Sequence, residues 1–183
     1  MDNGASSYLR FLNGENDAFA ELIRQYKDGL VLFINTFACD IHIAEEAADE
    51  TFLKLYVRRP RYSGACSFKT WLYTIGKNTA LNYLKKRSRQ SSRPLEYYYY
   101  ISDETDIESD YIKGEQNIIL HQALGALGKD YSQVLYLIYF EGLTAAEAAR
   151  IMGRTSRQVS DLIYRAKKAL RAELERRGFN GQI

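Results

Sequence analysis

Eleven lysines and arginines and no acidic side chain lie between residues 54 and 93. Residues 150–183 carry nine basic and three acidic side chains, whereas segments 1–53 and 94–149 carry ten acidic side chains each. Such concentrated positive charge repels itself unless a polyanion neutralises it. Nucleic acid is the leading candidate because phosphate neutralisation supplies most non-specific affinity. The alternative is a solvated face on which the charges cluster by chance.

The first basic segment also has the residue types that bind unpaired bases. Apolar spacing predicts a helix over 68–87, with a core side of Phe68, Leu72, Ile75, Thr79 and Tyr83. The opposite side would present Tyr73, Thr74, Lys77, Asn78 and Lys85, although Leu81 and Leu84 also fall there. Cations interleaved with aromatic rings and amides fit single-stranded nucleic acid. We expect Trp71, at the border of the core side, to pack in the core rather than to stack on a base.

A second nucleic-acid motif lies near the C-terminal end of the sequence. Thr144 with Glu147, and Thr155 with Gln158, form two capping boxes, and Gly153 separates the two helices that they open. Two helices joined by a short turn containing glycine form a helix-turn-helix. The second helix would present outward Arg157, Gln158, Ser160, Asp161, Tyr164 and Arg165, followed by the phosphate-contacting Lys167, Lys168 and Arg171. A simple helical hairpin within a bundle is the alternative.

Neither a catalytic site nor a metal site is visible in the sequence. His42 and His121 are isolated, and Cys39 and Cys66 lack metal-binding spacing. None of the common phosphate-loop, dinucleotide or metalloprotease motifs is found. We therefore expect a protein that is not an enzyme and that needs no cofactor or metal.

The elements that position these residues are predicted to be helices throughout. The chain has 183 residues with only two prolines, and its apolar residues recur at helical spacing over 19–37, 44–57, 118–127 and 131–138. We expect an all-α protein with a first domain over 1–88, an acidic and tyrosine-rich flexible linker over 89–115, and a second domain over 116–183. With no apolar run of about 18 residues and no visible signal peptide, we expect no membrane insertion and a cytoplasmic location.

The helix predicted over 44–57 has a second face besides its core side. Glu46, Glu50, Leu53 and Val57 recur along it at helical spacing. Exposed aliphatic side chains beside carboxylates suggest docking on a basic protein helix. The alternative is an ordinary charged surface.

Two stretches of the sequence resemble a known family. AEEAADETFLKLYV followed by FKTWLYTIGKNTALNYLKKR closely resembles region 2 of bacterial sigma-70 family factors, and LTAAEAARIMGRTSRQVSDLIYRAKKAL resembles their region 4. The order and separation of the two are similar to those of a group IV (extracytoplasmic function, ECF) sigma factor. The resemblance implies a factor that brings core RNA polymerase, through its β′ and β subunits, to promoter DNA, and that an anti-sigma protein holds inactive.

The resemblance also assigns roles to residues. Binding to the β′ clamp helices would fall on Glu46, Asp49, Glu50 and Phe52 or Leu53. Recognition of the melted −10 element would fall on loop residues 63–67 and on the following helix, at Ser63, Lys69, Trp71, Tyr73, Lys77, Asn78, Asn82, Lys85, Lys86 and Arg87. Recognition of the −35 duplex would fall on Thr155, Ser156, Arg157, Gln158, Ser160, Asp161, Tyr164, Arg165 and Lys168.

Three positions depart from the family pattern. Asp49 stands where glutamine is usual, Leu127-Gly128 replaces a leucine–proline pair, and Asp161 adds a negative charge to the recognition helix. Two rival functions are a stand-alone helix-turn-helix regulator and a sigma-like adaptor that binds only proteins. The first would bind duplex DNA specifically without polymerase, and the second would tolerate charge reversal at Arg157 and Lys168.

Overall fold

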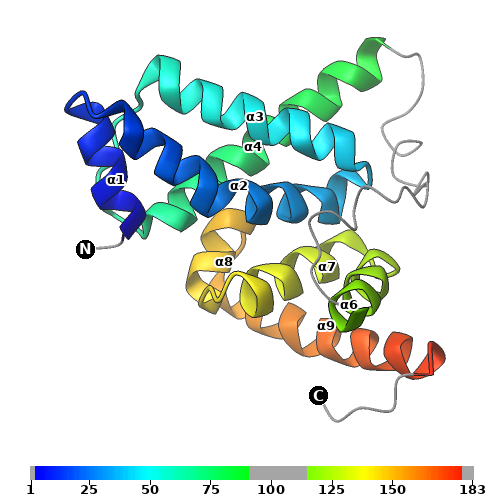
Figure 1. Ribbon diagram of the computed structural model, residues 1–183. Coiled ribbons are helices and arrows are strands. Elements are labelled where there is room, and N and C mark those ends of the chain that lie inside the picture. The colour runs from blue at the N-terminus through cyan, green and yellow to red at the C-terminus, as the bar shows by residue number, and fades with distance from the viewer. Residues whose placement is uncertain (1–2, 91–114, 179–183) are drawn as a thin grey trace.

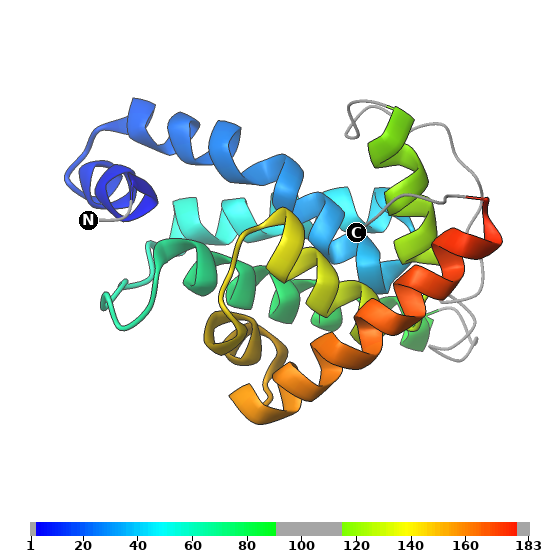
Figure 2. The same ribbon diagram turned by 90° about the horizontal axis from the view of Figure 1, so that it is seen from below.

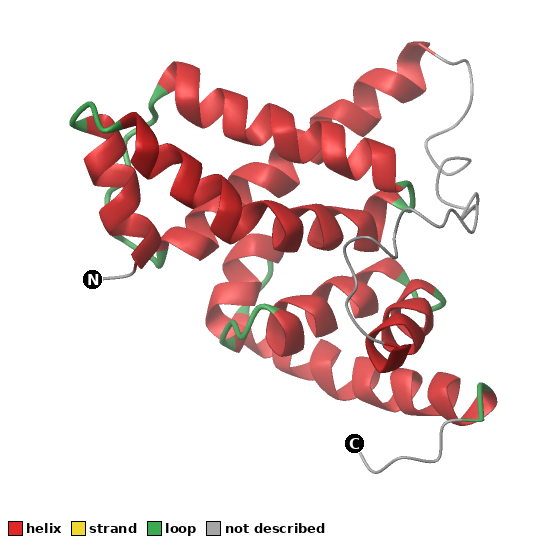
Figure 3. Ribbon diagram, in the orientation of Figure 1, coloured by secondary structure: helices red, strands yellow, loops and turns green. Residues whose placement is uncertain are grey.

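The computed structural model describes residues 3–90 and 115–178, and every regular element in these ranges is a helix (Figure 3). The predicted all-α class is therefore confirmed. The described part of the chain forms two bundles, which we call the first bundle (3–90) and the second bundle (115–178) (Figure 1). Residues 91–114, which hold most of the expected linker and its four tyrosines, lie outside the described residues.

The first bundle contains four helices: α1 (Asn3–Leu12), α2 (Asn16–Ala38), α3 (Ile41–Arg58) and α4 (Phe68–Gln90). Helix α2 packs along both α3 and α4, and its leucines and phenylalanines supply much of the core. The Asp40 side chain accepts a hydrogen bond from the Ile43 amide at 3.1 Å and so begins α3 directly after α2. Helix α4 continues to Gln90, so it includes the first two residues of the segment expected to be a linker.

Helix α1, which periodicity did not predict, closes one end of the first bundle. Tyr8 is fully buried, with its ring centroid 5.5 Å from that of Phe68 and 5.3 Å from that of Trp71. Its hydroxyl donates a hydrogen bond to the Pro60 carbonyl at 2.7 Å. This contact ties α1 to the loop between α3 and α4, where the candidate DNA-contacting residues begin.

The second bundle contains α6 (Glu115–Gly125), α7 (Lys129–Leu135), the π-helical turn η2 (Tyr136–Phe140), α8 (Ala145–Met152) and α9 (Ser156–Arg176). The helix expected over 131–138 is thus α7, and it ends in η2. Gly128 precedes α7 with φ −61° and ψ 143°, which are backbone angles that any residue, proline included, adopts. Gly128, which stands where the family pattern has proline, therefore keeps a backbone conformation at the start of α7 that proline would also adopt.

The two bundles pack directly against each other, which the sequence analysis did not predict. Helix α8 lies against α4, and α7 lies against α2, as the two perpendicular views show (Figures 1 and 2). The rings of Phe33 on α2 and Tyr136 on η2 stack across the boundary, with centroids 6.4 Å apart. One face of α4 is consequently covered by the second bundle.

His121 makes the stability of the second bundle dependent on pH. Its ring packs edge-on against Phe140, with centroids 4.7 Å apart, and burial lowers its pKa to about 4. Between pH 6.5 and about 4 the unfolded chain binds a proton that the folded chain does not, so stability falls as the pH falls. We expect this residue to contribute up to about 1.4 kcal/mol per pH unit in that window. Denaturant unfolding at pH 7 and pH 5 should show a weaker pH dependence for His121→Gln than for the wild type. Parallel losses in the two proteins would contradict the prediction, and His42→Gln, at an exposed histidine of the first bundle, is the control.

Candidate nucleic-acid interface

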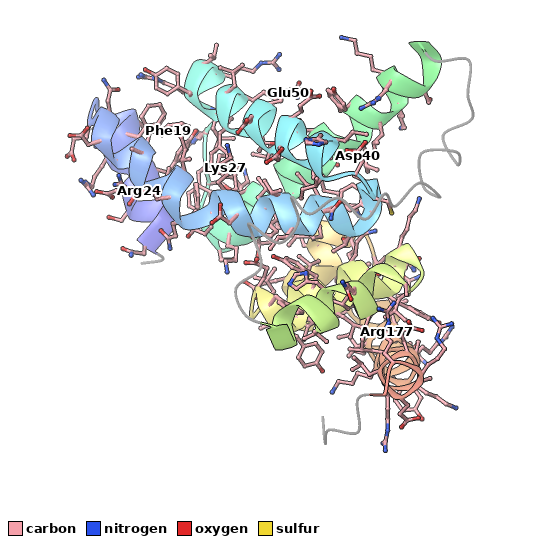
Figure 4. All side chains as sticks on the ribbon, turned by 45° about the vertical axis from the view of Figure 1, so that its right-hand side comes forward. Phe19, Arg24, Lys27, Asp40, Glu50 and Arg177 are labelled. Carbon is pink, nitrogen blue, oxygen red and sulfur yellow. The ribbon has the colours of Figure 1, made fainter. Side chains whose placement is uncertain are left out.

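The stripe predicted on α3 is exposed at Glu46, Leu53 and Val57 and half-buried at Glu50. Leu53 is 60% and Val57 68% exposed, with Glu50 one turn and Glu46 two turns before Leu53. Glu46 accepts a hydrogen bond from the Tyr83 hydroxyl, and the Glu50 carboxylate pairs with Lys54 at 2.7 Å. Figure 4 shows Glu50 on α3, on the side of the first bundle away from the second. The face is therefore accessible while the two bundles are packed together.

Phe52 and Leu53, the two alternatives for one place on the α3 face, differ in burial. Phe52 is only 4% exposed and packs edge-on against Phe19, whereas Leu53 is 60% exposed, so Leu53 is the one that lies on the exposed face. Asp49, one of the departures from the family pattern, is exposed and pairs with Lys27 of α2 at 2.7 Å. Tyr56, which sequence reasoning did not single out, is 44% exposed beside Leu53. Its three-residue spacing from Leu53 was the available signal.

The candidate −10 residues fall into two groups. The exposed group contains one residue of the loop and the far half of α4: Ser63, Asn78, Asn82, Lys85, Lys86 and Arg87. The second group, Lys69, Trp71, Tyr73 and Lys77, is half-buried or buried. The structure thus presents amides and cations together on one part of α4 but covers the part nearest the loop.

Tyr73 does not face outward as predicted. It is fully buried, with its ring centroid 5.4 Å from that of Phe33, and burial together with the nearby Glu141 carboxylate raises its pKa well above the usual value. Leu84, expected on the same outward side, is also buried. A single apolar stripe describes a helix covered on one side, whereas α4 lies between the rest of its own bundle and the second bundle.

Trp71 packs inside an aromatic cluster, as expected. Its ring centroid is 5.3 Å from Tyr8, 5.3 Å from Tyr62 and 5.5 Å from Phe68. The Tyr62 hydroxyl donates a hydrogen bond to the Cys66 carbonyl, which spans the loop. The cluster therefore supports loop 63–67 from beneath and leaves residues 63–65 exposed.

The helix-turn-helix has the local geometry that its sequence predicts. The Thr144 amide donates to Glu147 at 3.0 Å and the Thr155 amide to Gln158 at 2.9 Å, which completes both capping boxes. Gly153 ends α8 with φ 69°, a left-handed conformation that glycine adopts without strain. Buried side chains of α8 and α9 then hold the two helices together, among them Ala148, Met152, Val159, Leu162 and Ala166.

The N-terminal half of α9 presents an open polar surface. All nine candidate −35 residues are exposed: Thr155, Ser156, Arg157, Gln158, Ser160, Asp161, Tyr164, Arg165 and Lys168. Tyr164, at 74%, is the most exposed of the large hydrophobic side chains described. The Gln158 carbonyl oxygen is occupied by the Thr155 amide, and the Ser160 hydroxyl donates back to the Ser156 carbonyl at 3.0 Å. Arg157, Asp161, Tyr164 and Arg165 are therefore the side chains best placed to reach base edges.

Within residues 3–90 and 115–178, no cluster of histidine, cysteine or acidic side chains is arranged to hold a metal ion. Among the same residues, no helix is both long enough and apolar enough to cross a membrane.

Comparison with known proteins agrees with this arrangement. The Sigma-70 region 2 family matches residues 22–90, and the family Sigma-70, region 4 matches residues 117–170. RNA polymerase sigma-H factor of Pseudomonas aeruginosa is 30% identical to this chain over 175 residues, which is 91% of each chain. The ECF RNA polymerase sigma factor SigW of Bacillus subtilis is 26% identical, and the match covers 88% of this chain and 91% of SigW.

Two solved structures share the fold. The sigma factor RpoE in complex with the anti-sigma factor NepR from Bartonella quintana has a TM-score of 0.69 at 21% identity, covering 86% of this chain and 96% of that one. CnrH in complex with the cytosolic domain of CnrY has a TM-score of 0.65 at 20% identity, covering 95% and 98%. With both family regions matched in order and a relative 30% identical along nearly the whole chain, the protein belongs to the sigma-70 family as a non-enzymatic, ECF-type RNA polymerase sigma factor that directs promoter-specific transcription initiation.

Proposed function

We propose that the exposed stripe of α3 docks on the β′ clamp helices of core polymerase, that loop 63–67 with α4 holds the melted −10 strand, and that α9 reads the −35 duplex. The observation that carries the first assignment is that one face of α3 combines the exposed aliphatic side chains of Leu53 and Val57 with the carboxylates of Glu46 and Glu50. Aliphatic side chains next to carboxylates suit a partner helix that presents both apolar and basic groups.

The −10 assignment is supported by the far half of α4. Asn78, Asn82 and Lys85 are exposed at helical spacing, and Lys86 and Arg87 extend the positive charge. Amides can hydrogen-bond to the edges of unpaired bases, and the cations can neutralise the phosphates of a single strand. The loop beside them has room for an extruded base, because its residues 63–65 are exposed above the aromatic cluster.

The −35 assignment is supported by the start of α9. In helix-turn-helix proteins the N-terminal residues of the second helix enter the major groove. Arg157 is suited to guanine, and Asp161 can accept a hydrogen bond from the amine of cytosine. Asp161 thus becomes a specificity determinant rather than a defect of the recognition helix.

Two further partners follow from the assignment. The β subunit of core polymerase would be a partner alongside β′. An anti-sigma protein would regulate this chain, as NepR is the anti-sigma factor bound to the structurally similar RpoE. Both contacts, and the activity itself, would take place in the cytoplasm with core polymerase.

Run-off transcription tests the assignment directly. Core polymerase with this protein, on the DNA upstream of its own gene, should give a discrete start that core alone does not give. Glu50→Lys should abolish it together with co-elution with core, and Glu15→Lys, at an exposed carboxylate that is not on the α3 stripe, should retain both. Arg157→Glu should abolish transcription but retain co-elution. A protein that binds the duplex specifically without core, and that is unaffected by Glu50→Lys, would instead be a stand-alone regulator.

A further inference from the structure

Three arginines to which no role has been assigned lie where α3 ends and the loop to α4 begins. Arg58 is the last residue of α3, Arg59 follows it, and Arg61 lies two residues before loop 63–67. We call these three residues the arginine cluster. All three side chains are exposed, and within residues 3–90 and 115–178 none of them pairs with a carboxylate. By contrast, ion pairs hold Arg10, Arg154, Arg171, Arg176 and Arg177.

The backbone of Arg59 indicates that its side chain has a use beyond folding. Arg59 ends α3 with φ 44° and ψ 53°, a left-handed conformation in which a side chain is strained and glycine is not. Cys39 is the other non-glycine residue with a positive φ in the described part of the chain, and Gly153 ends α8 in the same region without strain. Folding alone would be served at least as well by glycine, and strain of this kind is typical of functional positions.

Contacts with α1 hold this strained segment in place. The Arg59 guanidinium lies over the Phe11 ring, 4.8 Å from its centroid, and the Tyr8 hydroxyl donates to the next carbonyl, that of Pro60, at 2.7 Å. Figure 1 shows α1 beside the end of α3 and the loop that follows it. A guanidinium held over an aromatic face can still donate from its N–H groups. Arg59 is therefore fixed in position and able to bind an anion.

The other two arginines lie close to the loop and to α4. Arg58 follows Lys54 by one turn, and the Lys54 ammonium donates to the Thr79 hydroxyl of α4 at 3.3 Å, so Arg58 is on the side of α3 that faces α4. Arg61 is two residues from Ser63, which is at most about 7 Å of extended chain. The arginine cluster therefore borders the loop that is proposed to hold an extruded base.

The chemistry of the arginine cluster fits the phosphates of a nucleic-acid strand. Each guanidinium presents a planar set of donors that matches the oxygens of a phosphate. The partner proposed for the α3 stripe is a basic helix, which the arginines would repel, so docking on core polymerase does not account for them. Because segment 54–93 has no acidic side chain, the neighbouring sequence supplies no anion either.

We propose that the arginine cluster binds the phosphates of the melted strand where it leaves loop 63–67 and continues toward the transcription start. This inference rests on the proposed −10 role of loop 63–67 and α4. The far end of α4 leads along the chain to the bundle that reads the upstream −35 duplex, so the loop lies at the downstream end of the strand site. The site is therefore longer than the −10 element, and its last part holds the strand without reading its bases.

Fork-shaped DNA with two lengths of unpaired strand tests the proposal in the holoenzyme. Both forks carry the promoter mapped by run-off transcription, with the −35 element as duplex and the −10 element unpaired. The short fork ends after the −10 element, and the long fork continues for about six nucleotides. With the full-length wild-type chain, we expect the long fork to bind at least about tenfold more tightly at about 0.15 M salt. Arg58→Ala with Arg61→Ala should weaken binding of the long fork at least about fivefold and leave the short fork within about twofold.

The salt dependence of binding separates a phosphate contact from a structural effect. Each contact with a single strand adds about 0.7 to the slope of log affinity against log salt, so Arg58→Ala with Arg61→Ala should reduce this slope by about 1.4 on the long fork. Arg58→Lys with Arg61→Lys keeps both charges and should retain the slope. Arg24→Ala with Arg176→Ala, at exposed arginines of α2 and α9, makes the same change in net charge and should leave both forks within about twofold of the wild type.

Arg59→Gly removes the third charge and the backbone strain together. Because glycine adopts φ 44° freely, the variant should unfold at a denaturant concentration no lower than that of the wild type. It should nevertheless weaken binding of the long fork by about threefold. A loss of binding in a chain that is at least as stable is not a consequence of misfolding.

The outcomes keep this inference apart from the proposed function. Equal affinity of the wild type and the double alanine variant for the long fork overturns the inference, while the −10 assignment stands. Losses of the same size on both forks, or a loss of co-elution with core, would place the arginines against the −10 element or against polymerase and also overturn it. Wild-type holoenzyme that bound neither fork would contradict the proposed function itself.

Discussion

Replacing Tyr8 with alanine is expected to lower the free energy of unfolding by about 3–5 kcal/mol. The side chain is fully buried between Phe68 and Trp71, so its removal leaves a cavity in the aromatic cluster. It also removes the hydrogen bond to the Pro60 carbonyl, which contributes about 0.5–1.5 kcal/mol of the loss. Denaturant unfolding followed by circular dichroism measures the effect.

Two variants set the scale for this loss. Tyr8→Phe keeps the ring and removes only the hydroxyl, so it should cost no more than the hydrogen bond. Tyr139→Ala removes an exposed tyrosine and should cost less than about 1 kcal/mol. If Tyr8→Ala were as mild as Tyr139→Ala, α1 would not be an integral part of the first bundle, and loop 63–67 would not depend on it.

Replacing Leu53 with aspartate is expected to weaken binding to core polymerase by about 2 kcal/mol or more, or at least about 30-fold. The side chain is 60% exposed at the centre of the α3 stripe, so it would be buried only in the complex. A new carboxylate there would be desolvated beside Glu50 without a partner. Titration of labelled full-length protein with core polymerase measures the affinity, and its unfolding free energy should stay within about 0.5 kcal/mol of the wild type.

Leu9→Asp is the matched control for this substitution. Leu9 is also an exposed leucine on a helix of the first bundle, at 38%, but it lies on α1 and not on the stripe. We expect it to leave core affinity nearly unchanged. Equal losses for Leu9→Asp and Leu53→Asp would show that α3 is not the docking face.

Local signals predicted the second bundle better than the first. The two capping boxes and Gly153 set the bounds of α8 and the start of α9, because side-chain and backbone geometry within a few residues determines them. Helix α1 was missed because its sequence, NGASSYLRFL, is short and combines a glycine and two serines of low helix propensity, although Ala5, Tyr8 and Leu12 recur at helical spacing. Its helical form is stabilised by the burial of Tyr8 and Phe11 against distant parts of the chain, which periodicity cannot detect.

In the candidate site, too, features set by local sequence could be predicted and features set by packing between distant parts of the chain could not. Exposure of Arg157, Tyr164 and Leu53 follows from helical spacing alone, and the structure places all three as expected. The inward position of Tyr73 does not follow, because it depends on how the second bundle lies against α4. Glu141 and Glu147 were likewise not identified as contacts of Lys69 and Ser67, although the alternation of acidic and basic segments was a signal that the two kinds of segment pair.

The π-helical turn η2 has a consequence for how insertions and deletions would act on this protein. A π turn holds one residue more than an α turn, and each residue of an α-helix rotates the next by about 100°. Glu141 follows directly after η2, so that surplus residue sets the side of the helix from which its carboxylate emerges toward Lys69. Deleting one residue between 136 and 140 would turn Glu141 away from α4. The contact with Lys69 would then be lost although both residues are still present in the sequence. The register of the backbone, and not only the identity of the charged residues, therefore decides whether related chains can make the same contact between their bundles.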